Sequence, residues 1–465
     1  MARKIFKSEE RRALFVTIIT LAWPTMLEQL MQTAVQYVDT AMVGSIGTQA
    51  TAAVGSTSTV SWLIGSTVSA IGIGFLSFIA RSIGAGDEKM AARASGQAIF
   101  AALVSGIAAT ILALSLSSRV PVWMHVDPSI QDIAGKYFFI LYVPMVFRAA
   151  TIIFGTVLRA AGDTRTPMRI GLLVNMVNVV LNFFMIYPSR RVSLFSTRIF
   201  VPGAGMGIIG AAIASAISFA VGGICITIAL WGHDLVSPRG QRISPDAEIL
   251  VPCIKTAIPN ILQRFGTSLG FVAFASMINS LGEISTAAHT IANTVESAFY
   301  IPGYGIQAAA STLAGNAVGA KDNRRLHSLT RMILFIEITL MIISGGLLFA
   351  FAPYMMRIFS KDPEVIALGA QVLRMVAVSE PFYGVSIIIE GVMMGVGATM
   401  VPFIFNITGM WGVRILGTFI CTSKLGLGLT SAWACMIMHN LFVFALFLVY
   451  YFRGHWNPNR KDPSD

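Results

Sequence analysis

A row of polar side chains follows one face of the first long apolar segment of the chain. The row consists of Glu28, Gln32, Gln36 and Asp39. Eleven residues at about 100° each return to nearly the same direction on a helix, so the row faces one way. On a helix that crosses a membrane, such a row has to face protein or water. We therefore interpret Asp39 as a candidate for proton exchange and the other three as candidate lining of a substrate cavity. The alternative for Asp39 is an acid at the helix end that meets the outer interface.

Three amides follow the same spacing in a later apolar segment. Asn175, Asn178 and Asn182 stand at i, i+3 and i+7, on one helix face. Their amide oxygens are able to hydrogen-bond a protonated Asp39 or to help coordinate sodium. The alternative is ordinary hydrogen bonding between helices. We predict that these amides belong to the ion-coupling site.

A second polar row lies in the other half of the chain. It consists of His289, Asn293, Glu296 and Tyr300, at spacings of four, three and four. A carboxylate and an aromatic ring on one face suit an organic cation, by charge and by cation–π contact. We predict that Asn293, Glu296 and Tyr300 line a cavity, together with Gln263 and Arg264 of the preceding segment. For His289 a local bond is the preferred interpretation, and the alternative for Glu296 is an ion pair with Arg264.

Further ionisable residues lie within apolar segments, where each costs roughly 2.5–3.5 kcal/mol on insertion scales. Glu390 precedes Gly391 and Gly395, a G-x-x-x-G pattern that lets a neighbouring helix approach closely. We place Glu390 at the cavity, with an ion pair to Arg374 or Arg414 as the alternative. Glu337 and Glu380 are interpreted as structural. In total, six acids and four bases lie within apolar segments. The four bases are Arg148, Arg264, Arg374 and Arg414.

Composition indicates the elements that have to position these residues. The chain of 465 residues is 55% hydrophobic and 12% charged, with a mean hydropathy of +0.73, whereas soluble domains carry about 25% charged residues. The apolar excess predicts an all-α polytopic membrane protein with twelve spanning helices. They are expected near 14–38, 50–79, 93–118, 131–158, 168–187, 206–231, 250–278, 286–315, 329–353, 365–394, 400–422 and 427–452. The four cysteines lie in these apolar runs without C-x-x-C spacing, so neither a disulfide framework nor a zinc site is expected.

Basic residues predict the orientation of the helices. If the N-terminus is cytoplasmic, the cytoplasmic segments hold 21 Lys and Arg residues and the outer loops hold 7. Only Arg190, Arg191 and Arg198, in one long outer loop, argue against this orientation. The positive-inside rule therefore predicts that both termini are cytoplasmic. The net charge of +11 is explained by this asymmetry and by anionic lipid, without nucleic acid.

The sequence repeats itself at an offset of 235 residues without a gap. Pro24 meets Pro259, Gly84 meets Gly319, and Asp127-Pro128 meets Asp362-Pro363. Each half holds six predicted spans, so both enter the membrane in the same sense, with a pseudo-two-fold axis along the membrane normal. We predict a leader at 1–13, an N-lobe at 14–231, a cytoplasmic linker at 232–249, a C-lobe at 250–452 and a disordered cytoplasmic tail at 453–465.

Several long motifs resemble one transporter family. The segments "PTMLEQLMQTAVQYVDTAMVGSIGTQATAAVG", "ARSIGAGDEKMAAR" and "LRAAGDTRTPM" look like the first half of the bacterial multidrug and toxic compound extrusion (MATE) family. The segment "AAHTIANTVESAFYIPGYGIQAAASTLAGNAVGAKD" looks like its second half, so the resemblance covers nearly the whole chain. It implies two six-helix lobes in the inner membrane. It also implies export of small amphipathic organic cations in exchange for H+ or Na+, by a chain that is expected to be a monomer.

The resemblance also bears on single positions. Family members carry a functional aspartate where Asp39 stands, and some have a second aspartate where this chain has Asn182. Some branches place an acid eight residues after the proline at position 259, where this chain has Thr267. A relay of two carboxylates and a sodium site of that second kind are therefore not expected.

Other functions are less well supported by the sequence. No P-loop, H-E-x-x-H or G-x-S-x-G motif occurs, so we expect no enzyme activity, cofactor or resident metal. Gly205-x-Gly207-x-x-Gly210 opens an apolar segment and follows no strand, which indicates helix packing and not dinucleotide binding. The loop from Arg81 to Arg93 lacks the motif of the major facilitator superfamily. The remaining alternative is a flippase for a lipid-linked precursor, but its anionic substrate would favour a cavity richer in bases than this one.

Overall fold

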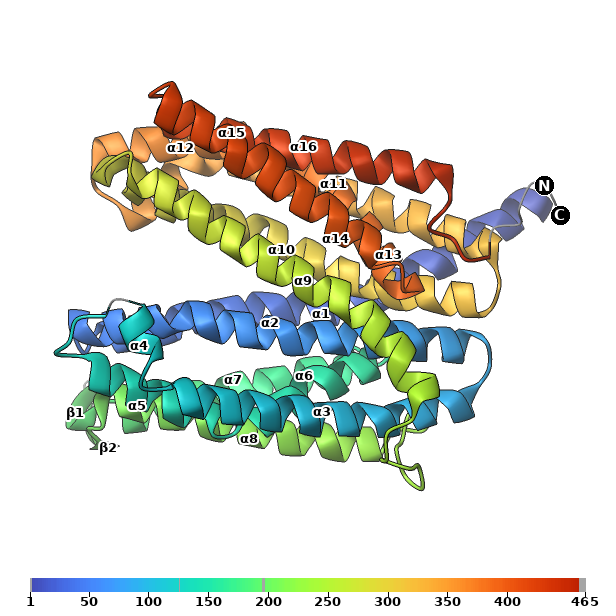
Figure 1. Cartoon of the computed structure of the whole chain (residues 1–465), viewed down its shortest axis with the longest axis horizontal. Coiled ribbons are helices and arrows are strands. Elements are labelled where there is room, and N and C mark those ends of the chain that lie inside the picture. The colour runs from blue at the N-terminus through green and yellow to red at the C-terminus, as the bar shows by residue number, and fades with distance from the viewer. Residues whose placement is uncertain (1, 125, 195–196, 460–465) are drawn as a thin grey trace. The chain divides into compact units, whose positions relative to one another are not determined.

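The computed structural model describes residues 2–124, 126–194 and 197–459, and nearly all of them are helical (Figure 1). The first half comprises α1 (Ala2–Gly44), α2 (Thr48–Gly84), α3 (Glu88–Leu116), α4 (Val120–Trp123), α5 (Gln131–Tyr142), α6 (Met145–Ala160), α7 (Arg165–Met185), β1 (Pro188–Leu194), β2 (Thr197–Ala204) and α8 (Gly207–Trp231). The second half comprises α9 (Ala247–Asn279), α10 (Glu283–Gly319), α11 (Asn323–Phe359), α12 (Pro363–Ala377), α13 (Glu380–Val396), α14 (Met400–Ile407), η1 (Thr408–Ile415), α15 (Leu416–Phe419), η2 (Ile420–Lys424) and α16 (Leu429–Arg453). The labels η1 and η2 denote π-helical segments. The predicted all-α polytopic class is confirmed.

The described helices account for the predicted spans with two differences. Nine helices are long and apolar enough to cross a membrane, and two bent pairs bring the number to eleven within the described residues. The remaining predicted span, at 286–315, corresponds to α10, which has 37 residues and is therefore about 55 Å long. It carries the polar residues of the second row, which lower its apolar character.

Two spans that we predicted as single helices are broken. The span at 131–158 consists of α5 and α6, which meet at 50°, and the span at 365–394 consists of α12 and α13, which meet at 54°. Pro144 stands at the N-cap of α6 and Pro381 in the first turn of α13. Proline lacks an amide hydrogen and disfavours a helical conformation in the residue before it, so each break falls where a helix would have to continue through proline.

The repeat of 235 residues is visible in the helix bounds. Helix α2 runs from residue 48 to 84 and α10 from 283 to 319, so both ends differ by 235. The same offset relates the first residues of α3 and α11, of α6 and α13, and of α7 and α14. The Gly, Pro and Asp residues that match between the two halves of the sequence therefore lie at the ends of equivalent helices.

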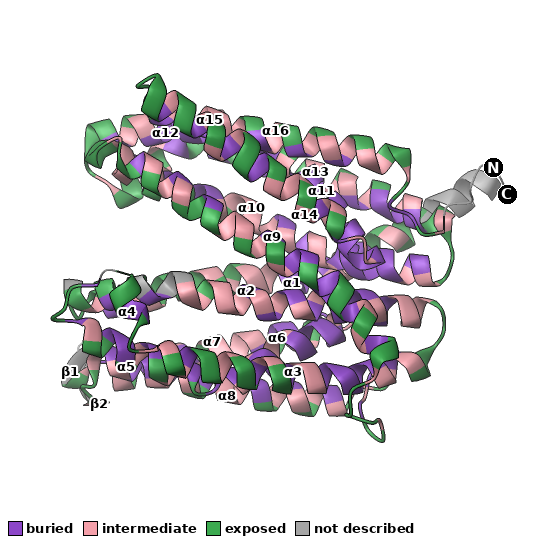
Figure 2. Ribbon diagram, in the orientation of Figure 1, coloured by how far each residue is buried: buried purple, intermediate pink, exposed green. Residues whose placement is uncertain are grey.

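The chain forms two compact units, and the boundary between them does not coincide with the boundary between the two halves of the sequence repeat. The C-terminal unit comprises residues 1–29, 76–87 and 252–465, and the N-terminal unit comprises residues 30–75 and 88–251. Each unit has its own buried residues, which follow one side of many helices in Figure 2. The lobe limits at 14–231 and 250–452 remain a prediction of the repeat.

In the C-terminal unit, the end of α2 crosses the end of α10 with almost no side chain between them. A Cβ on Gly84 would collide with the backbone of Asn316, and a Cβ on Gly319 would collide with the carbonyl oxygen of Arg81. These four positions form two pairs that are related by the repeat offset. Glycine is needed at both because only a hydrogen atom leaves room for the facing backbone.

In the N-terminal unit, a strap of residues 240–248 is fixed to α3. Buried Gln97 donates from Nε2 to the carbonyl oxygens of Arg242 and Ser244, at 3.1 and 2.9 Å. Its Oε1 accepts from the amide of Asp246 at 3.0 Å. Arg93 adds an ion pair of 2.6 Å to Asp246. The predicted linker at 232–249 is therefore held to α3 over its second half.

The beginning of the predicted tail is ordered, which corrects our expectation of disorder for residues 454–459. Trp456 is buried and stacks on Tyr451 with ring centroids 5.1 Å apart. Asn323, at the start of α11, exchanges hydrogen bonds with Asn457 and with the carbonyl oxygen of Asn459, at 3.0 and 2.7 Å. The sequence shows a polar segment, but its folding back onto α11 depends on side-chain contacts that spacing does not reveal. Residues 460–465 lie outside the described part of the chain.

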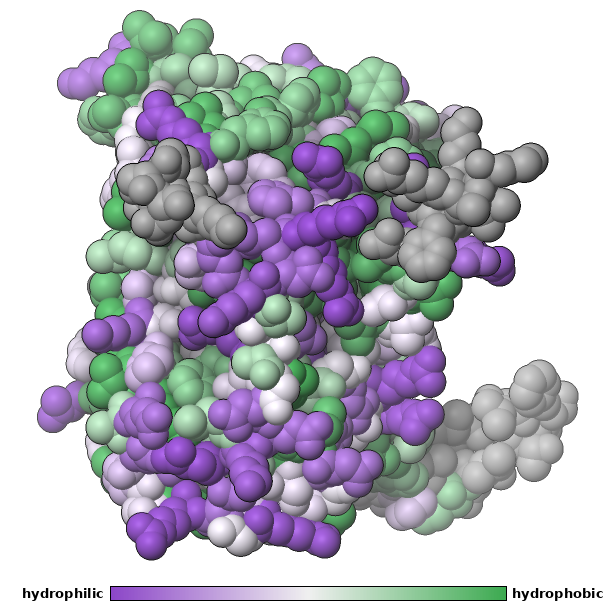
Figure 3. Space-filling model, turned by 90° about the vertical axis from the view of Figure 1, so that its right-hand side faces the viewer, coloured by the Kyte–Doolittle hydropathy of each residue, from purple (hydrophilic) through white to green (hydrophobic). Residues whose placement is uncertain are grey.

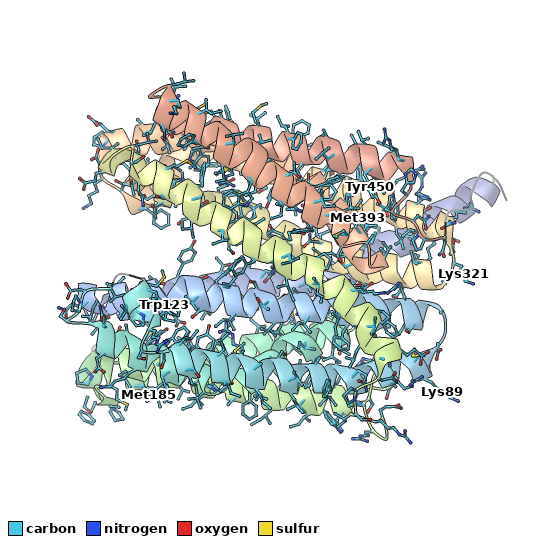
Figure 4. All side chains as sticks on the ribbon, in the orientation of Figure 1. Lys89, Trp123, Met185, Lys321, Met393 and Tyr450 are labelled. Carbon is cyan, nitrogen blue, oxygen red and sulfur yellow. The ribbon has the colours of Figure 1, made fainter. Side chains whose placement is uncertain are left out.

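One end of the helices carries many hydrophilic side chains. In Figure 4, Lys89 lies at one end of the N-terminal unit and Trp123 and Met185 at the other. Hydrophilic side chains gather on the face drawn in Figure 3, which is the side where Figure 4 places Lys89 and Lys321. The strands β1 and β2 form an antiparallel hairpin after α7. The side chains of residues 190–199, three of which are the arginines that oppose the predicted orientation, lie outside the described part.

Candidate functional site

Asp39 lies in the last two turns of α1, against α7 in the N-terminal unit. Asn182 of α7, buried at 1% exposure, donates from Nδ2 to Asp39 Oδ1 at 2.7 Å. The same nitrogen donates to Asn178 Oδ1, one turn earlier on α7, at 3.1 Å. The two helices therefore bring together the acid and two of the amides that the sequence predicts for one site.

Asn178 is able to bond Asp39 in two ways. In one orientation of its amide, the nitrogen donates to Ser215 of α8 at 3.0 Å and the oxygen faces the carboxyl group of Asp39. With the amide turned over, the nitrogen donates to Asp39 Oδ1 at 2.8 Å and Oδ2 at 3.1 Å, and the oxygen accepts from Ser215. The bond from Asn182 to Asn178 Oδ1 is then lost, because the two amide nitrogens face each other. An ionised carboxylate accepts hydrogen bonds only, whereas a protonated one also donates. The first orientation fits a protonated Asp39 and the second an ionised one.

The remaining members of the first row are placed differently. Asn175 is half-buried and has no hydrogen bond to Asp39 among the described residues. Gln32 and Gln36 are exposed on α1, while Glu28 is half-buried and belongs to the part of α1 in the C-terminal unit. Asn178 and Asn182 are thus within the hydrogen-bond network of Asp39, Gln32 and Gln36 are on the exposed side of α1, and Asn175 and Glu28 are in neither place.

The C-terminal unit contains a second polar group, around Glu390. Buried Gln263 of α9 donates from Nε2 to Glu390 Oε1 of α13 at 2.7 Å. Arg264 interacts electrostatically with the same carboxylate, and its Nε donates to Asn260 Oδ1 at 3.3 Å. Three predicted residues therefore meet here. The alternative partner Arg374 is elsewhere, exposed and against Phe349.

The alternative interpretation of Glu296, an ion pair with Arg264, is wrong. Glu296 is 6% exposed on α10, and the base that interacts with it electrostatically is Arg414 of η1. Within the described residues, neither arginine is in direct ion-pair contact with Glu296. Arg414 instead lies over the ring of Phe274, 4.1 Å from its centroid. The pairing failed because the π-helical turn that turns Arg414 inward has no sequence signature.

Sequence reasoning missed two tyrosines that join these groups. Tyr304 and Tyr383 share a hydrogen bond of 2.9 Å between their hydroxyl groups. Tyr300 packs edge-on against both, with ring centroids 6.0 and 5.6 Å away. Tyr304 stands four residues after Tyr300 and continues the predicted row, so its spacing was a usable signal. Tyr383 comes from α13, and nothing in its sequence surroundings indicates it.

The first two members of the second row are placed apart from Glu296 and Tyr300. The ring of His289 packs edge-on against Phe274 and Trp433, with centroids 5.6 and 5.8 Å away, and among the described residues its Nδ1 has no hydrogen-bond partner, so the local bond expected for it is not found. Asn293 is exposed, although Glu296 is buried less than one turn later. The row on α10 therefore passes from the surface of the C-terminal unit into its interior. The described residues include no group of three or more His, Cys, Asp or Glu side chains arranged to hold a metal ion.

Known proteins resemble this chain over almost all of its length. The family described as MatE matches residues 24–184 and 259–420, two segments separated by the repeat offset. A probable multidrug resistance protein NorM of Thermotoga maritima is 26% identical over 439 residues, 94% of this chain and 92% of that protein. A probable multidrug resistance protein YpnP of Bacillus subtilis is 24% identical over 450 residues, 94% of this chain and 95% of that protein.

Solved structures show the same fold. The outward-facing conformation of a multidrug resistance MATE family transporter has a TM-score of 0.87 at 21% identity and 97% coverage of both chains. A transporter of the MOP superfamily from Pyrococcus furiosus, described as having a binding pocket of reverse polarity, has a TM-score of 0.86 at 22% identity, also with 97% coverage of both. These neighbours have the two-lobed fold that the repeat predicts for this chain.

Proposed function

Because this chain belongs to the MATE family of multidrug efflux transporters, we propose that it exports small amphipathic organic cations in exchange for protons. Transport proceeds by alternating access between the two halves of the repeat. We place it in the bacterial inner membrane, with both termini cytoplasmic, as the distribution of basic residues favours. The transporter works as a monomer, without cofactor.

The observation that carries the proposal is the amide network around Asp39. Asn182 and Asn178 supply hydrogen bonds to this carboxyl group, and turning over one amide, Asn178, satisfies either protonation state. A group that exchanges a proton during transport has to be stable in both states, since otherwise one of them would be inaccessible. A proton at Asp39 removes the negative charge that favours a cation. Cation and proton are therefore alternatives, which is the requirement for exchange.

Side chains beyond Asp39 support a cationic substrate. Gln32 and Gln36 are exposed on a helix that crosses the membrane, and a primary amide there needs water or a polar partner, because hydrocarbon offers neither. The row on α1 therefore borders water. In the C-terminal unit, the rings of Tyr300, Tyr304 and Tyr383 supply aromatic faces, which suit an aromatic or quaternary cation. Glu296 and Glu390 lie near them, each with an arginine as its electrostatic partner.

Ethidium efflux from reconstituted vesicles tests the proposal. A proton gradient and a sodium gradient are imposed separately, with the Asp39→Asn protein as the matched control, since asparagine keeps the shape but cannot ionise. We expect efflux under the proton gradient, and none from the Asp39→Asn protein under either gradient. Efflux driven only by the sodium gradient would show that sodium, and not the proton, is the coupling ion. Uphill efflux by the Asp39→Asn protein would show that Asp39 has no part in coupling.

Ligand charge tests the substrate class separately. Thermal unfolding in detergent is measured with tetraphenylphosphonium and with anionic dyes of similar size. We expect stabilisation by the cation and none by the anions. Stabilisation by the anions instead would favour a flippase for an anionic lipid-linked precursor.

A further inference from the structure

Two carboxylic acids of the C-terminal unit lie outside both groups described so far. Glu337, near the middle of α11, is 0% exposed, and neither of its carboxyl oxygens has a hydrogen-bond partner among the described residues. Glu380, the first residue of α13, is 1% exposed, and its Oε2 is likewise unpartnered there. An acid that ties helices together has to bond a neighbouring group. The structural role that we assigned to both from the sequence is therefore not supported by their contacts.

Glycines of two neighbouring helices make the room for the Glu337 carboxyl group. A Cβ on Gly303 of α10 would lie 2.5 Å from Glu337 Oε1, and a Cβ on Gly384 of α13 would lie 3.0 Å from the same atom. Met341, one turn after Glu337, closes the space, with its Cε 2.7 Å from the Gly303 position and its Cγ 2.6 Å from the Gly384 position. The compartment holds a carboxyl group only as long as both positions lack a side chain.

Glu380 occupies the matching place on the opposite helix. A Cβ on Gly345 of α11 would lie 3.4 Å from the Cβ of Glu380. Gly345 stands eight residues after Glu337 and Gly384 stands four after Glu380, so each helix presents its acid and its glycine on one face. The carboxyl group of Glu337 thus faces a glycine of α13, whereas Gly345 makes room mainly for the carbonyl oxygen of Ala377 and is in ordinary contact with the Cβ of Glu380. Glu380 also interacts electrostatically with Glu337. The two acids share the seam between α11 and α13.

The charged and titratable groups around this seam do not neutralise Glu337. From α10 they are Glu296, Tyr300 and Tyr304, and from α13 Tyr383. Two bases lie near them: Arg414 of η1 interacts with Glu296, Tyr300 and Tyr383, and Arg264 of α9 interacts with Tyr304. No base interacts with Glu337 among the described residues. An ionised carboxylate without cation or hydrogen bond is costly in a dry interior. The compartment is matched to a protonated carboxyl group.

We propose that Glu337 and Glu380 form a second proton-binding site, which fills and empties as α13 moves at the break before it. Glu380 is in the first turn after the 54° break between α12 and α13. A rotation of α13 there separates Glu380 from Gly345 and withdraws Gly384 from Glu337, which admits water to both acids. That the two acids hold protons is argued from the contacts within the seam alone. The use of this site in transport rests on the proposed exchange of cations for protons.

Infrared difference spectroscopy of the purified full-length protein tests proton occupancy without transport. A protonated carboxyl group has a C=O stretching band apart from that of a carboxylate. We expect such bands at neutral pH, one lost in Glu337→Gln and one in Glu380→Gln, and both altered by tetraphenylphosphonium. Glu364→Gln, at an exposed acid of α12, is the matched control and should lose none. Bands absent from the wild type, or unchanged by the cation, would overturn the proposal.

A variant that keeps both acids covers the case in which a Gln variant does not fold. Gly384→Ala places a methyl group against Glu337 Oε1 and should shift the band assigned to Glu337 while leaving that of Glu380. Gly346→Ala, on the same helix as Glu337 but in open space, should shift neither. An unshifted spectrum for Gly384→Ala would contradict the compartment.

Proton release separates this proposal from the coupling role of Asp39. Tetraphenylphosphonium is added to unbuffered protein, and the released protons are counted with a pH indicator. We expect Asp39→Asn to release fewer protons than the wild type but still some, and addition of Glu337→Gln and Glu380→Gln to abolish the remainder. Complete loss in Asp39→Asn alone would refute the second site and leave the proposed function intact. A wild type that releases none would refute the proposed exchange, and the infrared bands would still decide whether the two acids hold protons.

Discussion

The hydrogen bond from Asn182 to Asp39 predicts how the pH dependence of transport should change. In Asn182→Leu the side chain keeps its branching but cannot donate, so Asp39 loses the bond of 2.7 Å. A hydrogen bond to a charged group contributes about 1.5–3 kcal/mol, and one pH unit corresponds to about 1.4 kcal/mol. The bond stabilises the ionised form, and its loss favours the protonated form. We therefore expect the pH at which cation affinity is half-maximal to rise by about 1–2 units.

The assay is tetraphenylphosphonium affinity, measured in detergent over a range of pH. Asn175→Leu is the matched control, because Asn175 stands two turns earlier on α7 and has no hydrogen bond to Asp39 among the described residues. It should keep the midpoint of the wild type. A midpoint for Asn182→Leu that coincides with the wild type, or an equal rise in Asn175→Leu, would refute the reasoning. Asp39→Asn should weaken the pH dependence and leave only the part that proton release from Glu337 and Glu380 contributes.

Two further predictions concern stability. Arg264→Gln leaves Glu390 without its basic neighbour and should lower the free energy of unfolding by about 3–5 kcal/mol. Adding Glu390→Gln should restore part of this stability, whereas adding Glu296→Gln should restore none. Thermal unfolding in detergent measures both effects. Gln97→Leu removes three hydrogen bonds to the strap, at about 1 kcal/mol each, so trypsin should cleave after exposed Arg242 faster than in the wild type. Equal cleavage rates would show that Gln97 does not hold the strap.

Much of the fold can be predicted from the internal repeat and the apolar segments of the sequence. The offset of 235 residues appears in the helix bounds themselves, because Gly, Pro and Asp at turns stop and start helices by local conformational preference. The breaks before α6 and α13 were missed, although Pro144 and Pro381 lie there. A hydropathy profile stays high through a bend, so length and apolarity alone join two short helices into one.

The candidate site was predictable where one helix carries the signal. Asn178 and Asn182 were identified by their spacing, and the structure places both beside Asp39. Partners on different helices were not predictable, because spacing within one segment says nothing about which segment faces it. For this reason the sequence indicates neither Glu390 as the partner of Arg264 nor Ser215 as the partner of Asn178.

The repeat places different chemistry at equivalent positions, and this leads to a last prediction. The residue that corresponds to Asp39 at the repeat offset is Phe274, whose ring, 1% exposed, lies under Arg414. An acid introduced there by Phe274→Asp would face that guanidinium group and stay ionised as its partner, so it would hold no exchangeable proton. In the Asp39→Asn background, Phe274→Asp should therefore fail to restore proton-driven ethidium efflux, whereas reversion to aspartate at position 39 should restore it. Restored efflux in the double variant would mean that the two halves are interchangeable as coupling sites. Its absence is expected because exchange depends on the amides of α7, which are able to bond an acid in both of its protonation states.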